Sequence, residues 1–414
     1  MMASVHFVKI DEAIGKRRGS PPTGLPLLRL GFRPFYLMAA LFAAAAVPLW
    51  LASYLGWRSA GAVGLVWHMH EMVFGFGVAV VIGFLLTAAR NWSGLWTPRG
   101  GALAALALLW LAGRVAMLCG PAAPSAGAVA AALIDWAFLP AAAWPLYDVL
   151  TRSGKRRNLP LLGIVALLAV ANAVFHAAMA GALPVSPLAA IHAALLLIVL
   201  LASILGGRVI PGFTANAVPG LQPVQHARRD ACAIALSAAA SAAWVLQAPG
   251  ALTAVLCWAA AVLVGWRLAG WQPWRTGGKP LLWALHAGYG WIALGYALLG
   301  GAAWLRGAAA GAALASSAWH ALAVGAMAGM MLAMMTRTAL GHTGRVLRAS
   351  NAEMAMFILL QAGAVLRLCA NIVPDSNRDL ILLSSGACWC TAFLLYAAVY
   401  GPYLSQPRVD GQDG

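Results

Sequence analysis

Apolar runs of about 20 residues follow one another along almost the whole chain, and they constrain the fold more than any other feature. A helix of that length crosses a hydrocarbon core of roughly 30 Å. Of the 414 residues, 62% are hydrophobic and only 9% are charged, and the mean hydropathy is +0.82. Soluble domains carry roughly 25% charged residues. The sequence therefore predicts an all-α integral membrane protein.

Twelve transmembrane helices are predicted. They form a membrane domain over residues 35–400, between an N-terminal segment at 1–34 and a tail at 401–414. No cleavable signal peptide is predicted, because residues 1–34 lack a continuous apolar core. The predicted spans are 35–55, 66–88, 102–119, 126–148, 159–180, 188–207, 230–247, 250–268, 281–302, 315–337, 352–373 and 379–400.

Basic residues alternate between the predicted connections. The chain has 27 Lys and Arg and a net charge of +16, and 22 of these cations lie in the termini and in alternate connections. The other connections hold only Arg58, Arg306 and Arg378. By the positive-inside rule, both termini are expected in the cytoplasm. The basic balance thus reflects topology, and nucleic-acid binding is not predicted.

Three predicted helices carry a histidine near their outer ends. His68, His192 and His320 are separated by 124 and 128 residues, and an arginine follows each helix at its inner end (Arg90, Arg208 and Arg337). Such spacing indicates one ligand-bearing unit used three times. With twelve spans, the natural unit is four helices repeated three times. Imidazole is a common ligand for haem iron and copper, so a metal or proton site near one membrane face is predicted.

The first of these histidines belongs to the sequence Trp67-His68-Met69-His70-Glu71. On an ideal helix, His68 and His70 point about 160° apart, so they should not share one metal ion. They either serve two sites, or the segment before Glu71 is unwound. Glu71 can face the same way as His68 and orient its imidazole or relay protons. A structural His–Glu pair is the alternative.

Three more histidines are candidate ligands, one near the outer face of the membrane and two near the inner face. His176 is predicted to lie outward, near the end of its span, whereas His286 and His342 lie toward the inner face. A loop after the tenth span could bring His342 over His286, which would form a second centre. Alternatively, His342 caps a helix end.

The tenth predicted helix also carries five methionines on the face of His320, if the helix is ideal: Met327, Met330, Met331, Met334 and Met335. Thioethers suit Cu(I) and can be axial haem ligands, but they also serve as adaptable packing. Arg114 and Asp135 are predicted to form an interhelical ion pair. Asn172, Tyr289 and Tyr296 are expected to bond a cofactor or another helix.

Several segments resemble the NnrS family. They are LRLGFRPF at 28–35, WHMHEMVFGF at 67–76, GFLLTA at 83–88, GGRVIPGFT at 206–214, LHAGY at 285–289 and MTRTALGHTGR at 335–345. The chain departs from the family pattern at Met69, where alanine is usual, and at Ala215, where arginine is expected. The resemblance implies a bacterial inner-membrane protein that contains copper and a non-covalent, b-type or related haem, and that is associated with denitrification and nitric oxide stress.

The sequence thus predicts a haem- and copper-binding membrane protein in nitric oxide metabolism or nitrosative stress protection, although its reaction is open. Membrane lipid, nitric oxide and a respiratory electron donor are the expected partners. A proton-coupled transporter and a non-catalytic sensor or assembly factor are the rival functions. The candidate cofactor ligands are His68, His70, His192, His286, His320 and His342, of which His68, His70, His192 and His320 are the candidate metal ligands; Glu71, His176, Arg208, Arg337, Met327 and Met331 are the supporting residues.

Overall fold

The computed structural model describes residues 24–57, 61–120, 125–154 and 156–414, so most of the predicted N-terminal segment lies outside the described residues. In the described part every regular element is helical and no strand occurs. The long helices form twelve rods, two of which are continuous through a π-helical segment: α1 (Phe32–Tyr54), α2–η2–α3 (Leu65–His70, Glu71–Gly77, Val78–Ser93), α4 (Gly101–Cys119), α5 (Ala126–Arg152), α6 (Leu159–Met179), α7 (Pro187–Ala217), α8 (Ala227–Val245), α9 (Gly250–Gly270), α10 (Pro280–Trp304), α11–η5–α12 (Ala309–His320, Ala321–Ala328, Gly329–His342), α13 (Asn351–Cys369) and α14 (Asp375–Ser405). Short 3-10 helices occur at Pro26–Leu28, Arg156–Asn158 and Pro273–Arg275.

Eleven of the twelve described rods are long and apolar enough to cross a membrane. The exception is α8, whose first turn contains Arg228, Arg229 and Asp230. The Asp230 carboxylate lies 3.4 Å from the Arg229 guanidinium and 3.3 Å from that of Arg267 in α9. The 19 residues of α8 include that charged turn, and the helix packs between α7 and α9, as the predicted twelve-helix fold requires.

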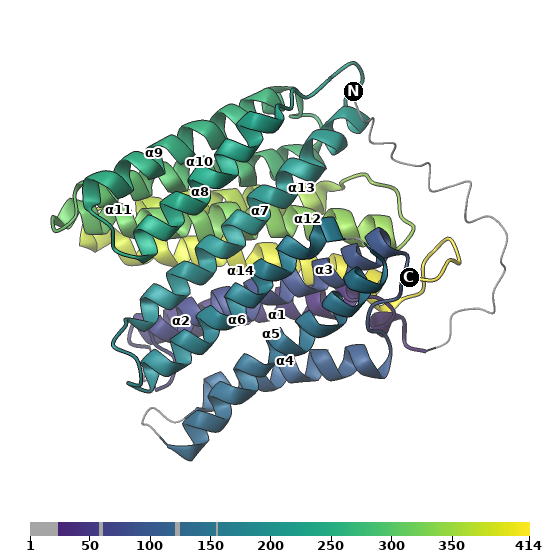
Figure 1. Cartoon of the computed structure of the whole chain (residues 1–414), viewed down its shortest axis with the longest axis horizontal. Coiled ribbons are helices and arrows are strands. Elements are labelled where there is room, and N and C mark those ends of the chain that lie inside the picture. The colour runs from purple at the N-terminus through teal and green to yellow at the C-terminus, as the bar shows by residue number, and fades with distance from the viewer. Residues whose placement is uncertain (1–23, 58–60, 121–124, 155) are drawn as a thin grey trace.

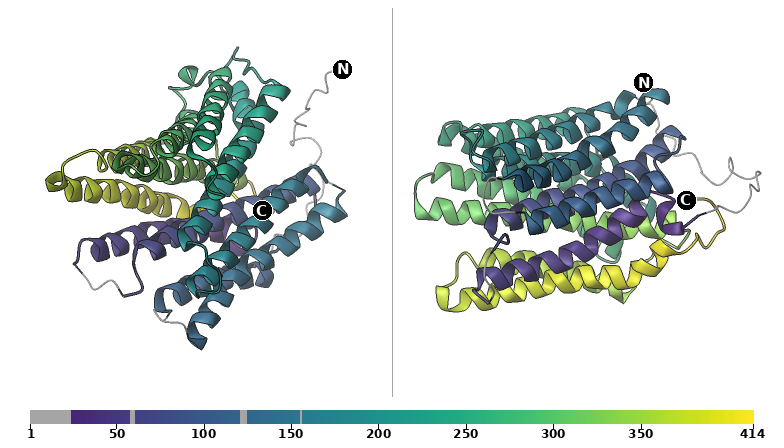
Figure 2. Two further views of the ribbon diagram at one scale, coloured as in Figure 1. Left: turned by 60° about the vertical axis from the view of Figure 1, so that its left-hand side comes forward. Right: turned by 90° about the horizontal axis from the view of Figure 1, so that it is seen from below.

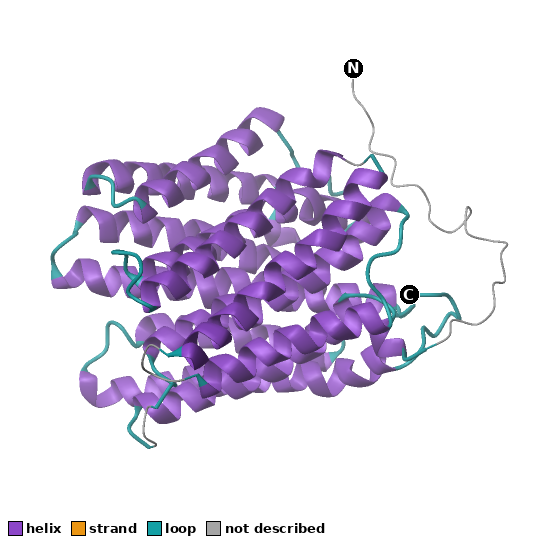
Figure 3. Ribbon diagram, turned by 60° about the horizontal axis from the view of Figure 1, so that its bottom comes forward, coloured by secondary structure: helices purple, strands orange, loops and turns teal. Residues whose placement is uncertain are grey.

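Successive rods run in opposite directions, and their connections gather at the two ends of the molecule (Figures 1 and 3). The start of α1 and the end of α14 consequently lie at the same end, to the right in Figure 1. The second view of Figure 2 shows the rods running nearly parallel. The arrangement is that of a multi-pass bundle with both described ends of the helical domain on one side.

Three rods form the middle of the bundle: α2–η2–α3, α7 and α11–η5–α12. The most apolar stretch of the first is 94% buried, that of the third 78% and that of α7 50%, compared with 22% in α5, and α7 contacts both of the other two rods. The other helices pack around them in three groups, which are α4, α5 and α6, then α8, α9 and α10, and finally α13, α14 and α1. Each group follows one central rod in the sequence, and α1 completes the last group. This order fits a unit of four helices used three times.

Several helices end later than predicted. The predicted connection at 208–229 is helical as far as Ala217, and α12 continues through His342, which was expected in a loop. Likewise, α14 continues to Ser405, beyond the predicted boundary at residue 400. Polar residues mark where a helix leaves the apolar layer, but a helix can continue past that level because its backbone bonds are satisfied internally.

Candidate functional site

The three histidine-bearing rods pack directly against one another. They meet at Gly77 in η2, where an added Cβ would lie 3.1 Å from Met327 Sδ of η5 and 3.3 Å from Ile198 Cδ1 of α7. A Cβ at this position would require these two side chains to shift by a few tenths of an ångström. The second, sixth and tenth predicted helices therefore contact one another in the folded bundle.

A π-helical segment follows the histidines in two of these rods. In the first, η2 begins directly after His70, and in the third, η5 begins directly after His320. Such segments are rare and often occur at functional sites, since they re-aim side chains over one wider turn. In the described residues α7 has no such segment, so the three units are not identical. The continuous α2 also excludes an unwound stretch before Glu71.

The outer histidines of the three rods have aromatic or backbone partners. The His68 ring stacks on Trp50 at 4.1 Å and 17°, and the His192 ring stacks on Trp319 at 3.9 Å and 7°. His320 Nδ1 donates a hydrogen bond to the Ser316 carbonyl oxygen at 2.7 Å. A carbonyl can only accept, so a neutral His320 presents the lone pair of Nε2.

His68 has a buried ring nitrogen, Nδ1, without a hydrogen-bond partner among the described residues. Arg367 in α13 lies within electrostatic range of both His68 and His320, which are also within range of each other. These two imidazoles therefore occupy one region near the same end of the central rods. A buried polar atom without a partner is costly, so it often indicates a ligand or ion that would satisfy it.

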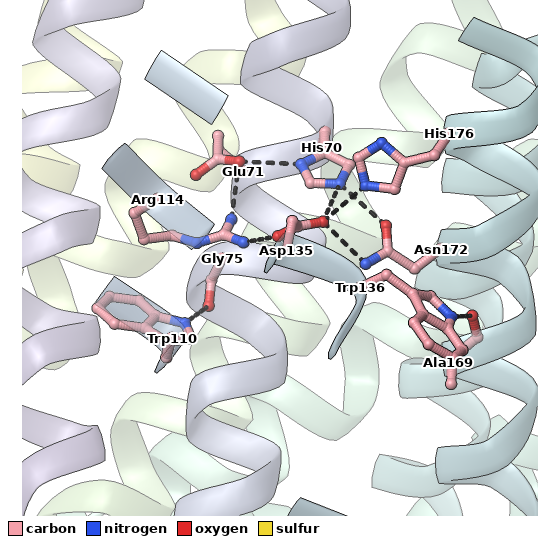
Figure 4. A network of polar contacts seen from close by, with 10 residues as sticks. All are labelled: His70, Glu71, Gly75, Trp110, Arg114, Asp135, Trp136, Ala169, Asn172 and His176. Carbon is pink, nitrogen blue, oxygen red and sulfur yellow. Dashed lines mark hydrogen bonds and ion pairs between the residues drawn. The ribbon is translucent and has the colours of Figure 1, made fainter. Parts of the chain in front are cut away.

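His70 belongs to different surroundings, as Figure 4 shows. Its Nδ1 donates to Glu71 Oε1 at 2.9 Å, and its Nε2 lies 3.1 Å from Asn172 Oδ1 and 3.4 Å from Asp135 Oδ2. The ring is fully buried and contacts the rings of Phe74 and Phe175. Because His68 and His70 have different partners, the prediction that they do not share one site is consistent with the structure.

Three further helices, α4, α5 and α6, supply the remainder of this cluster around His70. Arg114 of α4 donates to Glu71 Oε1 at 2.7 Å and also pairs with Asp135 Oδ1 of α5. His176 Nε2 and Asn172 Nδ2, both from α6, donate to Asp135 Oδ2 at 2.9 Å. We call these six residues the polar cluster: His70, Glu71, Arg114, Asp135, Asn172 and His176.

The polar cluster is charge-balanced when His70 is an imidazolium ion. Both ring nitrogens face oxygen acceptors, so a proton on each nitrogen satisfies both contacts. The cations His70 and Arg114 then offset the carboxylates Glu71 and Asp135. The side chains of Glu71, Arg114 and Asp135 are at most 5% exposed, so water stabilises these charges little and each charge is stabilised by the opposite charges beside it.

Small residues and one indole hold this cluster in position. An added Cβ at Gly75 would lie 2.9 Å from Arg114 Nη1, and one at Gly113 would lie 3.2 Å from the Asp135 backbone. Trp110 Nε1 donates to the Gly75 carbonyl oxygen at 3.1 Å. The glycines thus let α4 approach both η2 and α5 closely enough for Arg114 to bridge them.

The predicted role of Glu71 is wrong in one respect. Glu71 was expected to orient His68, but its Oε1 contacts His70 and Arg114.

The predicted Arg114–Asp135 ion pair is confirmed. Sequence reasoning named Asn172 and His176 separately and missed that they join Asp135. Their spacing of four residues puts both on one face of α6, and that signal could have found the cluster.

The methionines of the third rod do not keep the directions calculated for an ideal helix, because residues 321–328 form a π-helix. Met327 packs at Gly77, whereas Met330, Met331 and Met334 line a cavity of about 70 Å³ between α1, α3, α7, α10 and α12. We call it the central cavity. Its other walls are almost entirely apolar and include Val81, Ile198, Leu201 and Leu285.

The inner candidates have separate neighbours. His286 Nδ1 donates to the Leu282 carbonyl oxygen at 3.0 Å, and its Nε2 lies 3.4 Å from Thr214 Oγ1. His342 Nε2 lies 3.4 Å from Asn91 Nδ2. His342 is the last residue of α12, so the predicted mobile loop that would carry it to His286 is wrong.

The predicted supporting arginines lie toward the ends of their rods that are opposite the histidines. Arg208 Nη1 donates to Asn158 Oδ1 at 3.2 Å, and the Arg337 guanidinium lies 3.8 Å from the centre of the Phe213 ring. Tyr289 and Tyr296, which could have bonded a cofactor, instead bond other helices through Ser203 and Ser241.

The fold and these buried groups define a multi-pass helical membrane protein whose histidine-bearing rods converge at its centre. The family model described as NnrS protein matches residues 26–408, which is nearly the whole chain. The chain therefore belongs to the NnrS family. A comparison with curated proteins gives no match.

Proposed function

We propose that this chain is a haem- and copper-binding protein of the bacterial inner membrane, with both termini in the cytoplasm, that acts in nitric oxide metabolism or in protection against nitrosative stress. Family membership supports the link to nitric oxide. The observation that carries the metal proposal is the convergence of three histidine-bearing rods, with a buried nitrogen of His68 that has no hydrogen-bond partner in the described part of the chain.

His68 and His320 are the residues that fit haem iron best. His68 has its unpartnered Nδ1, and the Ser316 carbonyl orients His320 so that Nε2 can act as a ligand. Stacking on Trp50 fixes the plane of the His68 ring. Bound haem would supply an iron that binds nitric oxide and exchanges electrons. His192, stacked on Trp319 beside His320, would complete the outer site.

The central cavity suits a diatomic gas. Its volume of about 70 Å³ is far below the roughly 300–1,000 Å³ of pockets for drug-sized ligands, so it does not accommodate a haem macrocycle. Apolar cavities stay dry and accept apolar guests. Nitric oxide is small and weakly polar, and the cavity lies where the three central rods meet. It would concentrate the gas within the protein.

The first test is the absorbance and metal content of the full chain purified in detergent, followed by its nitric oxide consumption with an added electron donor. Haem absorbance with copper would support the metal proposal. Consumption of nitric oxide above that of the haem-free protein would support turnover rather than sensing. A preparation without either metal, in a protein that keeps its helical circular dichroism, would contradict the proposal.

A proton-coupled transporter remains the second candidate because the polar cluster places five ionisable groups among membrane helices. Proteoliposomes with an internal pH-sensitive dye separate the two functions. Substrate-dependent proton uptake by metal-free protein would favour the transporter. Its absence, combined with haem-dependent nitric oxide chemistry, would favour the first proposal.

A further inference from the structure

We propose that the polar cluster is a binding site for one first-row divalent transition metal ion, with His70, His176 and Asp135 as its ligands. The geometry of these described residues carries the proposal, which depends neither on haem nor on nitric oxide. The three ligand atoms, His70 Nε2, His176 Nε2 and Asp135 Oδ2, all lie within 4.8 Å of one another. Asp135 and His176 come from α5 and α6, outside the three central rods.

The distances match a metal-ligand set. Tetrahedral ions with ligand bonds of 2.0–2.2 Å hold their ligand atoms about 3.4 Å apart. Asp135 Oδ2 lies 3.4 Å from His70 Nε2 and 2.9 Å from His176 Nε2. Asn172 Oδ1 lies 3.1 Å from His70 Nε2 and would serve as the fourth ligand of a tetrahedral ion. Shifts of a few tenths of an ångström would admit the ion.

The surrounding residues have the roles of partners that orient metal ligands. Glu71 Oε1 accepts from His70 Nδ1 at 2.9 Å, which leaves Nε2 as the coordinating nitrogen. Arg114 engages Glu71 and the other oxygen of Asp135, so that Oδ2 is the carboxylate oxygen that faces both histidines. When the ion binds, it replaces the proton that His70 Nε2 carries in the metal-free cluster, and the proton on His176 Nε2 moves to Nδ1 of the same ring, so that both Nε2 atoms can coordinate.

The ligand chemistry selects the class of ion. Two imidazoles with carboxylate and amide oxygens suit Cu²⁺ and Zn²⁺, and the divalent series favours Cu²⁺. No cysteine or methionine belongs to the polar cluster, so its donor set does not select Cu⁺. The side chain of His176 is 13% exposed whereas those of His70 and Asp135 are at most 1% exposed, so an ion would enter on the His176 side.

The experiment uses the full chain in detergent, stripped with a chelator, reloaded with Cu²⁺ or Zn²⁺ and desalted before metal analysis. Wild-type protein should retain one ion that His176→Gln loses, and its Cu²⁺ paramagnetic resonance should show nitrogen coupling that weakens in the variant. His226→Gln is the matched control, because His226 is exposed and its side chain lies in a connection before α8. That control should keep the ion.

A second variant separates coordination from general damage. His176→Cys loaded with Co²⁺ should gain a thiolate-to-cobalt absorption band that wild-type protein, with its own six cysteines, lacks. Unchanged metal retention in His176→Gln together with no new band in His176→Cys would overturn the site and leave an ion-pair cluster. Haem absorbance read on the same samples tests the proposed function separately, because His68 and His320 are intact in every variant.

Discussion

Replacing Arg114 with glutamine should strongly destabilise the fold, because it removes the cation that joins two buried carboxylates. The side chains of Glu71, Asp135 and Arg114 are 0%, 1% and 5% exposed. Removing one partner from a buried ion pair costs about 3–5 kcal/mol, mainly because the remaining charge has no water. We expect Arg114→Gln to lower the free energy of unfolding by about that amount.

A surface pair in the neighbouring helix provides the control. Arg152 Nη1 lies 3.0 Å from Asp148 Oδ2 in the same turn of α5, but those side chains are 66% and 45% exposed. Exposed pairs contribute about 0–1 kcal/mol. Arg152→Gln, the same chemical change, should therefore alter the free energy of unfolding by less than about 1 kcal/mol.

Charge balance makes a sharper prediction for a double variant. Arg114→Gln leaves one uncompensated negative charge, and adding Asp135→Asn removes it again. The double variant should therefore be more stable than Arg114→Gln alone, and the effects of the two single changes should depart from additivity by about 0.5–3 kcal/mol. The assay is denaturant unfolding in detergent with a chelator present, followed by circular dichroism. Additive losses, or an Arg114→Gln effect as small as that of Arg152→Gln, would refute the charge-balanced cluster.

Three further predictions concern the bundle. Reporter fusions near residue 345 should signal the cytoplasm and fusions near 184 the opposite side, and a reversed pattern would overturn the charge-based topology. Gly288→Ala should lower the free energy of unfolding by about 1–3 kcal/mol, because its Cβ would lie 2.9 Å from the Met330 backbone nitrogen; Gly290→Ala, whose nearest neighbour is Leu268 Cδ2 at 3.4 Å, is the control that should change little. Leu201→Trp, which fills the central cavity, should reduce xenon binding measured by nuclear magnetic resonance, and unchanged binding would locate the gas elsewhere.

The helical membrane fold could be predicted because apolar runs and alternating basic loops report directly on the bilayer. The histidine spacing likewise identified the three rods that converge. Sequence could not reveal the π-helices after His70 and His320, because an apolar run inside a long span looks the same whether the turn is α-helical or π-helical. The π-helices changed the direction of every residue beyond them, which is why the ideal-helix directions of the methionines failed.

The candidate site was only partly predictable for a related reason. A pair such as Arg114 and Asp135 can be inferred when two charges lie at similar depths in adjacent spans. The choice of Glu71 between His68 and His70 depends on where α4 puts Arg114, and that position is a result of packing. The same holds for Asn172 and His176, whose partner Asp135 lies on a different helix.

The central claim, that converging outer histidines hold haem iron, is tested most directly by the haem absorbance of the purified chain beside that of His68→Ala and His320→Ala. The account predicts a haem band in the wild-type protein that shifts or disappears in each variant, while His226→Ala leaves it unchanged. A wild-type spectrum without haem, or an identical haem band in all three variants, would contradict the claim.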